Sequence, residues 1–428
     1  MFDSSEELNL LKIRINKGGI PLKGKINISG AKNAALPLMV ASLLTDEPVT
    51  LDNVPALADV RTMSNLLGIL GVNVDCSGSS MKLTAKDICS TTAPYDLVKK
   101  MRASVLVLGP LLARAKQAKV SLPGGCAIGV RPINLHIQGL QTLGAEIDLQ
   151  DGYIAAKAPN GLKGGTVNFN VPTVTGTENI MMAAVLAKGT TTVINAACEP
   201  EVVDLAKCLN SMGAKIRGHG TKKITIEGVD TLHGAKHKII YDRIEAGTYA
   251  IAAAITRGEI ELVGEGLGAL MSGAADVFEQ AGISVEGTKQ GLMVNADKLC
   301  PINVSTEPFP GFPTDLQAQI MALMCITEGA SVITENIWEN RFLHVPELCR
   351  MGADITLKGA KAGIKGVKKL QGAPVMATDL RASFGLVLAG LAAGGVTVIG
   401  RTYHLVRGYE NAVGKLQACG ADIEEINF

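Results

Sequence analysis

Charged and polar residues recur where apolar helical segments are expected to begin. They are Lys32, Asn33, Arg102, residues 173–177, Asp242, Arg243, Glu245, Thr314, Asp315, Thr378, Asp379 and Arg381. For Asp, Thr and Asn, ordinary helix capping is as good an explanation as a functional role. The cations fit capping poorly, because a positive side chain at a helix N-terminus opposes the helix dipole. A bound phosphate or carboxylate would remove that conflict, so the pattern predicts a site for a small anionic ligand.

A second candidate group is the thiol of Cys126, which lies among three glycines shortly before Arg131. This composition predicts an exposed loop over residues 122–132. A thiol beside cations can act as an acid or a nucleophile, but an inert role for Cys126 agrees equally well with the composition. His136 is likewise as consistent with a structural histidine as with a ligand. The nine cysteines lack the paired short spacing of zinc sites, so we expect no metal and mostly reduced thiols.

The overall composition excludes several classes of protein. The 428 residues include 41 Lys and Arg against 40 Asp and Glu, a formal charge of +1. This balance, with 1 Trp, 6 Tyr and 8 Phe, argues against general binding to nucleic acid or to a membrane surface. The longest uncharged stretch, residues 382–400, is expected to form a buried helix and a strand. The acidic N-terminus lacks the features of a signal peptide, so the cytoplasm is the expected compartment.

A repeated phrase organises the whole chain. A glycine between an apolar or small residue and another small residue, followed by a β-like stretch, recurs at Gly71, Gly144, Gly213, Gly282, Gly352 and Gly420. Successive glycines lie 68 to 73 residues apart, which indicates six units of roughly seventy residues. Each glycine is expected to end a helix, and the residues after it to form a strand. The units are therefore predicted to be mixed α/β.

The helices of these units are expected to lie inside and the sheets outside. One apolar segment precedes each glycine, at residues 34–44, 103–113, 180–187, 249–255, 316–326 and 382–393. These segments are apolar on nearly every side, which predicts complete burial. Residues 223–227 alternate apolar and polar side chains, as in a strand that buries one face. Six repeats are too many to share one hydrophobic core, so we expect two domains of three units each. The boundary is expected near the basic, loop-like residues 233–238, and a ligand cleft between the domains.

Six sequence motifs mark the chain as similar to a known family. They are residues 30–37 (GAKNAALP), the Cys126 loop, 314–319 (TDLQAQ), 339–342 (ENRF), 378–383 (TDLRAS) and 407–410 (RGYE). Together and in this order they resemble the UDP-N-acetylglucosamine 1-carboxyvinyltransferases, the MurA family of enolpyruvyl transferases. The resemblance covers nearly the whole chain and leaves only an N-terminal extension unmatched.

The resemblance implies a fold of two inside-out α/β barrels, each of three βαβαββ units, with residues 32–239 in one domain and 1–31 plus 240–428 in the other. It implies transfer of the enolpyruvyl group of phosphoenolpyruvate to the 3-hydroxyl of UDP-N-acetylglucosamine by addition and elimination, with release of phosphate. In the family this is the first committed step of peptidoglycan synthesis, which serves cell-wall biogenesis, cell shape and cell division. No cofactor or metal is implied, and the partners are the two small substrates.

The resemblance also assigns roles to individual residues. Cys126 would protonate phosphoenolpyruvate and form a covalent adduct with it, Asp315 would be the general base, and Asp379 a second acid, base or orienting group. The groups that would hold phosphate and carboxylate are Lys32, Asn33, Arg131, Arg341, Arg381 and Arg407. The groups on the nucleotide-sugar side would be Arg102, Arg131, Pro132, Ile133, Asn134, Leu135, Val171, Pro172, Thr173, Val174, Asp315 and the backbone of Ile337.

The chain departs from some family members on the nucleotide-sugar side. Residues 171–176 (VPTVTG) carry Val and Thr where some members have Lys, Ser and Gly, and Asn134 stands where some have Asp. Backbone contacts would survive these changes, whereas side-chain contacts and affinity are in question. Cys126 is retained where a minority of the family has Asp, so the epoxide fosfomycin is expected to inactivate the protein.

Two alternatives make different predictions. 5-Enolpyruvylshikimate-3-phosphate synthase shares phosphoenolpyruvate and the repeats, but its first loop is typically Lys-Ser-Xaa-Ser-Asn-Arg, whereas Asn33 and Ala34 follow Lys32 here. It also lacks the glycine-flanked thiol. A repeat scaffold that binds a protein partner would explain the helices, but not the thiol, cations and aspartates at their starts.

Overall fold

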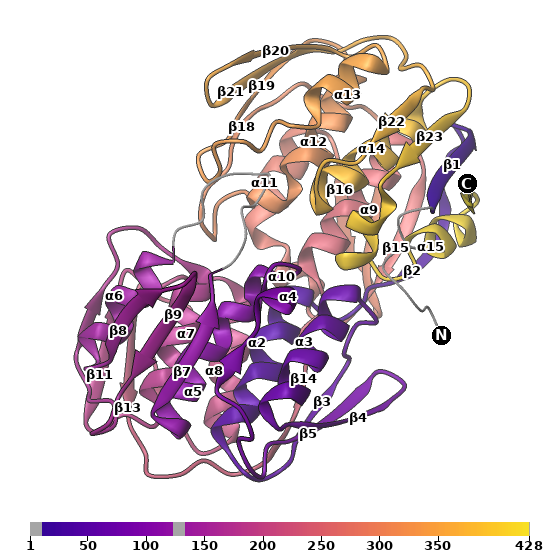
Figure 1. Ribbon diagram of the computed structural model, residues 1–428. Helices are drawn as coiled ribbons and strands as arrows, with labels where there is room; N and C mark the ends of the chain where they lie inside the picture. Colours follow the sequence, from indigo (N-terminus) through magenta and orange to yellow (C-terminus); the bar gives the residue numbers. More distant parts are fainter. Residues whose placement is uncertain (1–10, 123–132, 428) are drawn as a thin grey trace. The chain divides into compact units, whose positions relative to one another are not determined.

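The computed structural model describes residues 11–122 and 133–427 (Figure 1). Contacts within the chain divide these residues into two compact units. We call residues 30–122 and 133–240 the first unit, and residues 11–29 and 241–427 the second unit. The chain therefore passes from one unit to the other at residues 29–30 and again at 240–241.

Each unit contains three four-stranded sheets in its described residues, all built on one plan. A parallel pair at one edge is followed by two antiparallel pairings. The sheets of the first unit are β14 (Ala235–Lys238)-β3 (Val49–Asp52)-β5 (Ser80–Thr84)-β4 (Asn73–Ser77), β6 (Thr92–Ala93)-β7 (Gln117–Ser121)-β9 (Tyr153–Lys157)-β8 (Glu146–Gln150) and β10 (Thr166–Asn168)-β11 (Thr190–Ile194)-β13 (Lys223–Glu227)-β12 (Lys215–Arg217).

In the second unit the N-terminal strands complete two of the three sheets. The sheets are β16 (Ser284–Gly287)-β17 (Gly291–Asn295)-β15 (Glu259–Val263)-β2 (Lys23–Asn27), β18 (Asn303–Ser305)-β19 (Ala330–Thr334)-β21 (Lys361–Lys365)-β20 (Asp354–Lys358) and β22 (Pro374–Met376)-β23 (Thr397–Gly400)-β1 (Lys12–Lys17)-β24 (Asp422–Ile426). Strand β1 lies between two strands from the other end of the chain, and Ile13 pairs with Ile399. The periodicity of the sequence does not contain this pairing.

Helices of both units pack against the sheets, and some of them are wholly buried. Those of the first unit are α2 (Lys32–Ala41), η1 (Ser42–Leu44), α3 (Ala58–Leu70), α4 (Tyr95–Val98), η2 (Arg102–Val107), α5 (Leu108–Ala115), α6 (Asn134–Thr142), α7 (Val174–Ala184) and α8 (Pro200–Ser211), where η marks a 3₁₀ helix. Those of the second unit are α9 (Arg243–Ile255), α10 (Leu267–Leu270), α11 (Ser272–Gln280), η3 (Thr314–Leu316), α12 (Gln317–Cys325), α13 (Val345–Arg350), α14 (Leu380–Ala392), η4 (Thr402–Arg407) and α15 (Ala412–Ala418).

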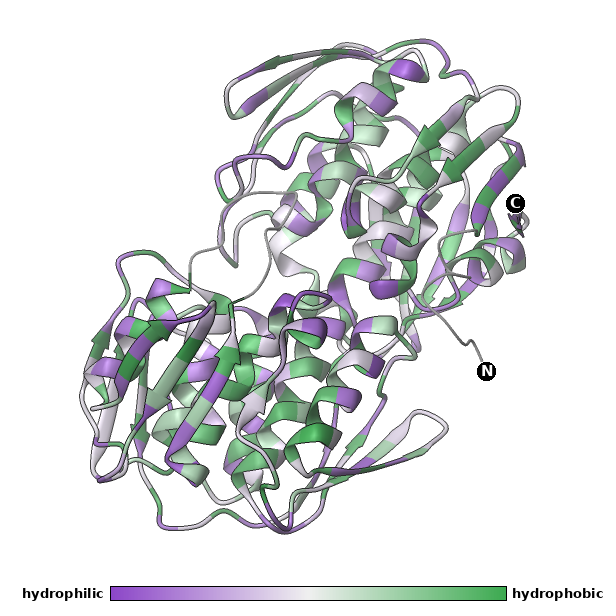
Figure 2. Ribbon diagram, in the orientation of Figure 1, coloured by the Kyte–Doolittle hydropathy of each residue, from purple (hydrophilic) through white to green (hydrophobic). Residues whose placement is uncertain are grey.

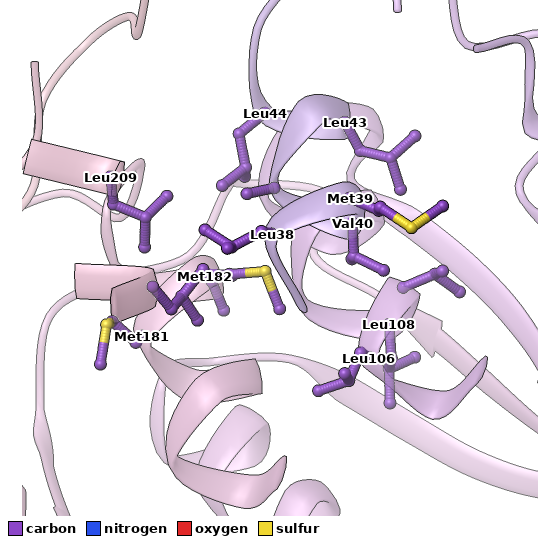
Figure 3. Packing of buried hydrophobic residues seen from close by; sticks show 14 of the residues in the cluster. Leu38, Met39, Val40, Leu43, Leu44, Leu106, Leu108, Met181, Met182 and Leu209 are labelled. Atoms are coloured by element: carbon purple, nitrogen blue, oxygen red, sulfur yellow. The ribbon is translucent and has the colours of Figure 1, made fainter. Parts of the chain in front are cut away.

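The predicted inside-out arrangement is confirmed. Every residue of α9 is buried, and so is every residue of α7 from Gly176 onward. Figure 2 shows hydrophobic residues along the interior helices of each unit. Figure 3 shows side chains of α2, among them Met39, packing near Leu108 and Met182 of the same core. Such helices need no polar face, because other helices and the sheets surround them.

The predicted ends of the helices and the one-sided strands are also confirmed. All six repeat glycines have positive φ, from 80° at Gly282 to 105° at Gly71. This left-handed conformation closes a helix at little cost only for glycine. Strand β13 buries Ile224 and Ile226 and turns its charged side chains outward.

Helices α7 and α9 begin at Val174 and Arg243, within the polar residues predicted to lie at helix starts and about one and two-thirds turns before the apolar segments. Two local predictions are wrong. Residues 103–113 form the 3₁₀ helix η2 followed by α5, not one α-helix. The basic stretch 233–238 contains strand β14, which pairs with β3 at an edge of its sheet. An edge strand tolerates exposed charges, and Lys236 pairs with Asp52 at 3.0 Å.

Within the described ranges, the helices are too short or too polar to cross a membrane.

Candidate active site

In the second unit two buried arginines hold the carboxylate of Asp315, which lies in η3 directly before α12. Its Oδ1 accepts a hydrogen bond of 2.9 Å from Arg341 Nη2, and its Oδ2 one of 3.0 Å from Arg381 Nε. The arginine side chains are 4% exposed and that of Asp315 is 25% exposed. Two positive charges around one negative charge leave an excess that an anionic ligand would balance.

Arg381 keeps hydrogen-bond donors for such a ligand. Its Nη1 and Nη2 atoms are buried and make no well-aligned hydrogen bond in the part of the chain that the structure describes, although the Tyr409 hydroxyl lies near enough to interact with the guanidinium. Burial favours the neutral form of this side chain, but the charge of Asp315 holds the pKa of Arg381 above its usual range, so the guanidinium stays protonated. Buried donors without an acceptor are costly, and a carboxylate or phosphate could accept from both nitrogens at once.

Glu335, which directly follows β19, supports Arg341 through the hydroxyl of Thr314. Arg341 Nη1 donates to Thr314 Oγ1 at 3.2 Å, and the Thr314 hydroxyl donates to the Glu335 carboxylate at 2.9 Å. Glu335 Oε1 also accepts the backbone N–H of Ile337 at 2.9 Å. A substrate contact by the backbone of Ile337 would therefore use its carbonyl. Glu335 was not among the predicted site residues, because a single acid directly after an alternating strand is not enough to mark a site.

Asp379 is the N-cap of α14. Its Oδ1 accepts the backbone N–H groups of Arg381 at 3.0 Å and Ala382 at 3.1 Å. Capping thus orients the helix that carries Arg381, while Oδ2 lies 3.3 Å from the Thr378 hydroxyl. Nearby His344 is fully buried, and burial lowers its pKa to about 4 although Asp379 acts in the opposite direction, so the ring is neutral at pH 7.

In the first unit Lys32 opens α2 without help from a capping side chain or an acid in the first turn. Its Nζ lies 3.4 Å from Asp59 Oδ2, and the two side chains are 12% and 5% exposed. This ion pair offsets part of the conflict between the lysine and the helix dipole, which the sequence pattern attributed to a ligand alone. Asn33 follows in the same turn and is half-buried.

A neutral network joins α6, α7 and α5. His136 Nδ1 and Asn179 Nδ2 lie 3.0 Å apart, and His136 Nε2 lies 3.2 Å from Thr175 Oγ1. Asn179 Oδ1 accepts the backbone N–H of Gly109 at 2.7 Å. Burial, with a smaller effect of the Arg102 charge, lowers the pKa of His136 to about 4. His136 is therefore a neutral structural histidine, which decides between its two possible roles.

This network lies beside the residues predicted to hold the nucleotide sugar. Ile133 is the N-cap of α6 and Asn134 its first residue, while Thr173 caps α7 by accepting the N–H of Gly176 at 3.2 Å. Helix α6 packs against α7, and η2, which begins at Arg102, packs against both α2 and α7. These contacts therefore link the four helices of the first unit that begin at predicted segments.

The remaining predicted residues differ in accessibility. Leu135 is buried, so a ligand could reach only its backbone, whereas Val171 and Pro172 are exposed and Val174 is half-buried. Arg407 ends η4 in the second unit and is half-buried. Three further predicted residues, Cys126, Arg131 and Pro132, lie outside the described residues. In the ranges that are described, His, Cys, Asp and Glu form no group of three that could hold a metal ion.

The fold and these residues define a class of enzyme. A family model described as EPSP synthase (3-phosphoshikimate 1-carboxyvinyltransferase) matches residues 16–416. The chain therefore belongs to the EPSP synthase family and is an enolpyruvyl transferase. It is similar in structure to the enolpyruvyl transferase NikO from Streptomyces tendae, with a TM-score of 0.88 and 24% identity over 98% of this chain and 99% of that one. EPSP synthase from Acinetobacter baumannii gives a TM-score of 0.75 at 18% identity, over 97% and 100% of the two chains.

Curated relatives are much more similar in sequence. A protein of Rhodospirillum centenum named UDP-N-acetylglucosamine 1-carboxyvinyltransferase is 60% identical over 428 residues, which is 97% of this chain and 99% of the relative. A protein of the same name from Dinoroseobacter shibae is 57% identical over 414 residues, 96% of this chain and 98% of the relative. The predicted family and the predicted fold class are thereby confirmed.

Proposed function

We propose that this enzyme transfers the enolpyruvyl group of phosphoenolpyruvate to the 3-hydroxyl of UDP-N-acetylglucosamine and releases phosphate. The names of relatives at 57–60% identity support this acceptor. The single structural observation that carries it is the buried cluster of Asp315 between Arg341 and Arg381. The cluster combines a carboxylate, which can take the proton of a hydroxyl group, with guanidinium groups, which can bind an anion. A reaction between a sugar alcohol and phosphoenolpyruvate requires both.

The reaction proceeds by addition and elimination. In the addition, the sugar oxygen bonds to C2 of phosphoenolpyruvate, its proton leaves, and another proton joins C3, which gives a tetrahedral ketal. In the elimination, the bond from C2 to the phosphate oxygen breaks and C3 loses a proton, which restores the double bond. Negative charge on phosphate and carboxylate persists throughout, so fixed cations stabilise both steps without reorganisation.

In this proposal Asp315 takes the hydroxyl proton. Each of its carboxylate oxygens accepts a hydrogen bond from one arginine, and the side chain is a quarter exposed, so a substrate hydroxyl can reach it. The two donors of Arg381 bind an anionic group of phosphoenolpyruvate, with Lys32 and Arg407 as further cations. Asp379 orients Arg381 as the helix cap and takes part in proton transfer through its second oxygen.

In this proposal the thiol of Cys126 supplies the proton to C3. When its sulfur, in place of the sugar oxygen, bonds to C2, the same addition gives a covalent adduct with phosphoenolpyruvate, and the reverse step releases it. Cys126→Ser is therefore expected to lower turnover by about two to four orders of magnitude while binding of UDP-N-acetylglucosamine persists. Fosfomycin is expected to inactivate the enzyme but not this variant. Turnover equal to that of the wild type would remove the thiol from the mechanism.

We further propose that the reaction serves as the first committed step of peptidoglycan synthesis in the cytoplasm, and so cell shape and cell division. Phosphate release tests the activity itself. Phosphoenolpyruvate with UDP-N-acetylglucosamine should release phosphate, whereas phosphoenolpyruvate with shikimate 3-phosphate should not. The opposite result would replace the proposed acceptor, and no release with either acceptor would reject the proposal.

A further inference from the structure

A buried polar cluster lies beneath the Asp315 site in the second unit, and the mechanism above does not use it. We call Thr248, Gln319 and Tyr409 the polar hub. Gln319 Nε2 lies 2.9 Å from the Tyr409 hydroxyl and 3.2 Å from Thr248 Oγ1, and the two hydroxyl oxygens are 3.1 Å apart. All three residues are buried, at 0% to 2% exposure. They come from α9, α12 and the turn after η4, so the hub joins three separate elements.

The directions of these hydrogen bonds follow from counting protons. Thr248 donates its single hydroxyl proton to the carbonyl of Ile244 at 2.7 Å, so toward the hub its oxygen can only accept. The Tyr409 hydroxyl therefore donates to Thr248 and accepts from Gln319. The amide of Gln319 is oriented by its bond of 3.0 Å to the Asp315 carbonyl, which needs a donor. In this orientation Gln319 Oε1 is buried without a partner among the described residues. The hydrogen bonds of Nε2 therefore determine how the amide is turned.

Two members of the hub, Gln319 and Tyr409, lead to residues of the proposed active site. Gln319 donates to the backbone carbonyl of Asp315 itself. The ring of Tyr409 lies under the guanidinium of Arg381, with 5.4 Å between the guanidinium carbon and the ring centre. Tyr409 also follows Arg407 by two residues and donates its backbone N–H to Leu405 at 3.0 Å. Tyr409 therefore contacts Arg381, is linked to Asp315 through Gln319, and lies two residues from Arg407.

We propose that Tyr409, Gln319 and Thr248 are positioning residues, which hold the backbone of Asp315 and the plane of Arg381 in register for the reaction. The inference rests on the proposed function of the Asp315 site. The two protons of Gln319 Nε2 are shared among three acceptors, the Asp315 carbonyl, the Tyr409 hydroxyl and Thr248 Oγ1. Without the Tyr409 hydroxyl, the second proton turns toward Thr248, which tilts the amide against the Asp315 carbonyl. The carboxylate then shifts against Arg381. Small displacements of this kind reduce the rate of the chemical step more than they reduce substrate binding.

The second unit contains a matched control in the same aromatic cluster. Phe384 lies between two tyrosines, with its ring centre 4.4 Å from that of Tyr409 and 5.5 Å from that of Tyr249. Both phenols are buried, but the Tyr249 hydroxyl has no hydrogen-bond partner among the described residues. Tyr409→Phe and Tyr249→Phe therefore remove the same atom from the same core, and only the first removes a hydrogen bond.

The experiment compares kcat, KM and the pH dependence of kcat for the two variants, using phosphate release from phosphoenolpyruvate and UDP-N-acetylglucosamine. We expect Tyr409→Phe to lower kcat about 10- to 100-fold with nearly unchanged KM, and Tyr249→Phe to match the wild type. We also expect the acidic limb of the kcat profile to move to higher pH in Tyr409→Phe, because a looser contact with Arg381 stabilises the Asp315 carboxylate less. A role in stability alone would not move that limb.

Gln319→Met provides a second test, because it removes the donor to Asp315 while the phenol stays in place, and it should change kcat in the same direction. Equal kcat for the two tyrosine variants, or an acidic limb that stays in place in both Tyr409→Phe and Gln319→Met, would overturn the inference. If the wild type uses shikimate 3-phosphate instead, the proposed function fails, and the same comparison is made with that acceptor.

Discussion

The two units share one architecture but place different chemistry at the starts of their buried helices. In the second unit the helix starts carry charges, with Asp315 held by Arg341 and Arg381. The first unit has an ion pair at the start of α2, between Lys32 and Asp59, and a buried neutral pair of amide and imidazole, Asn179 and His136. The difference follows from partners, because a buried arginine stays charged beside a carboxylate, whereas a buried histidine without one loses its proton. A repeated fold therefore determines where side chains meet, and individual residues determine what they can do.

The largest expected effect comes from removing the negative charge of the second unit's cluster. Asp315→Asn leaves two buried guanidiniums without a carboxylate, so we expect the free energy of unfolding to fall by about 3 kcal/mol and kcat by about a thousandfold. Urea unfolding and phosphate release measure the two. The control is Asp96→Asn in an exposed pair with Lys99, which should leave both unchanged. If the two variants were equally stable, burial of the charged Arg341 and Arg381 side chains would not require the Asp315 carboxylate.

The neutral network of the first unit predicts a dependence on pH. The pKa of His136 is about 4 in the folded chain and about 6.5 in an unfolded chain. The unfolded state therefore binds more protons between these values, so stability is complete above pH 6.5 and is lost as the pH falls toward 4, by up to about 3 kcal/mol. His136→Gln should reduce the slope of the free energy of unfolding over this range without abolishing it, because buried His344, with a pKa of about 4, contributes a slope of the same sign. The same slope in the wild type and the variant would contradict the assignment.

A smaller effect tests the close approach of α5 and α7 in the first unit. A Cβ atom at Gly109 would lie 2.3 Å from Asn179 Oδ1, so Gly109→Ala should destabilise the protein by about 2 kcal/mol. Gly68→Ala, in α3, is the matched control, because nothing lies within 4 Å of its Cβ position. It should instead stabilise the protein by about 0.5 to 1 kcal/mol. Thermal unfolding distinguishes the two, and changes of the same sign would show that the contact with Asn179 is unimportant.

The smallest effect on stability separates capping from catalysis in the second unit. Asparagine caps a helix about as well as aspartate, and Asp379 Oδ1 accepts both capping bonds of α14. Asp379→Asn should therefore change the free energy of unfolding by less than about 0.5 kcal/mol. If Asp379 also transfers protons, kcat falls while stability stays the same. Unchanged kcat would limit this residue to orienting Arg381.

Much of the fold could be predicted because it is encoded over short stretches of chain. Gly71 and its five counterparts mark helix ends through their own backbone preference, and the apolar segments show their burial by composition. The strand β14 escaped prediction because its charged residues suit an edge strand as well as a loop.

The candidate site was only partly predictable. Its members could be named from motifs, but their partners could not, because Arg341 and Arg381 lie 26 and 66 residues beyond Asp315. Asp59 beside Lys32 and Glu335 behind Arg341 carried no signal strong enough to single them out. Gln319 and Tyr409 stood inside recognised motifs without a role, because a role in support is defined by contacts.

The sequence by itself determined the number of repeats, the buried helices, the one-sided strands and the residue types available for chemistry. Each of these depends on the spacing of neighbouring residues along the chain. Only the tertiary structure decided that β1 and β2 complete sheets of the second unit, that Asp315 is shared by two arginines, and that His136 is neutral. These outcomes depend on which distant groups share a desolvated space, and that is a property of packing.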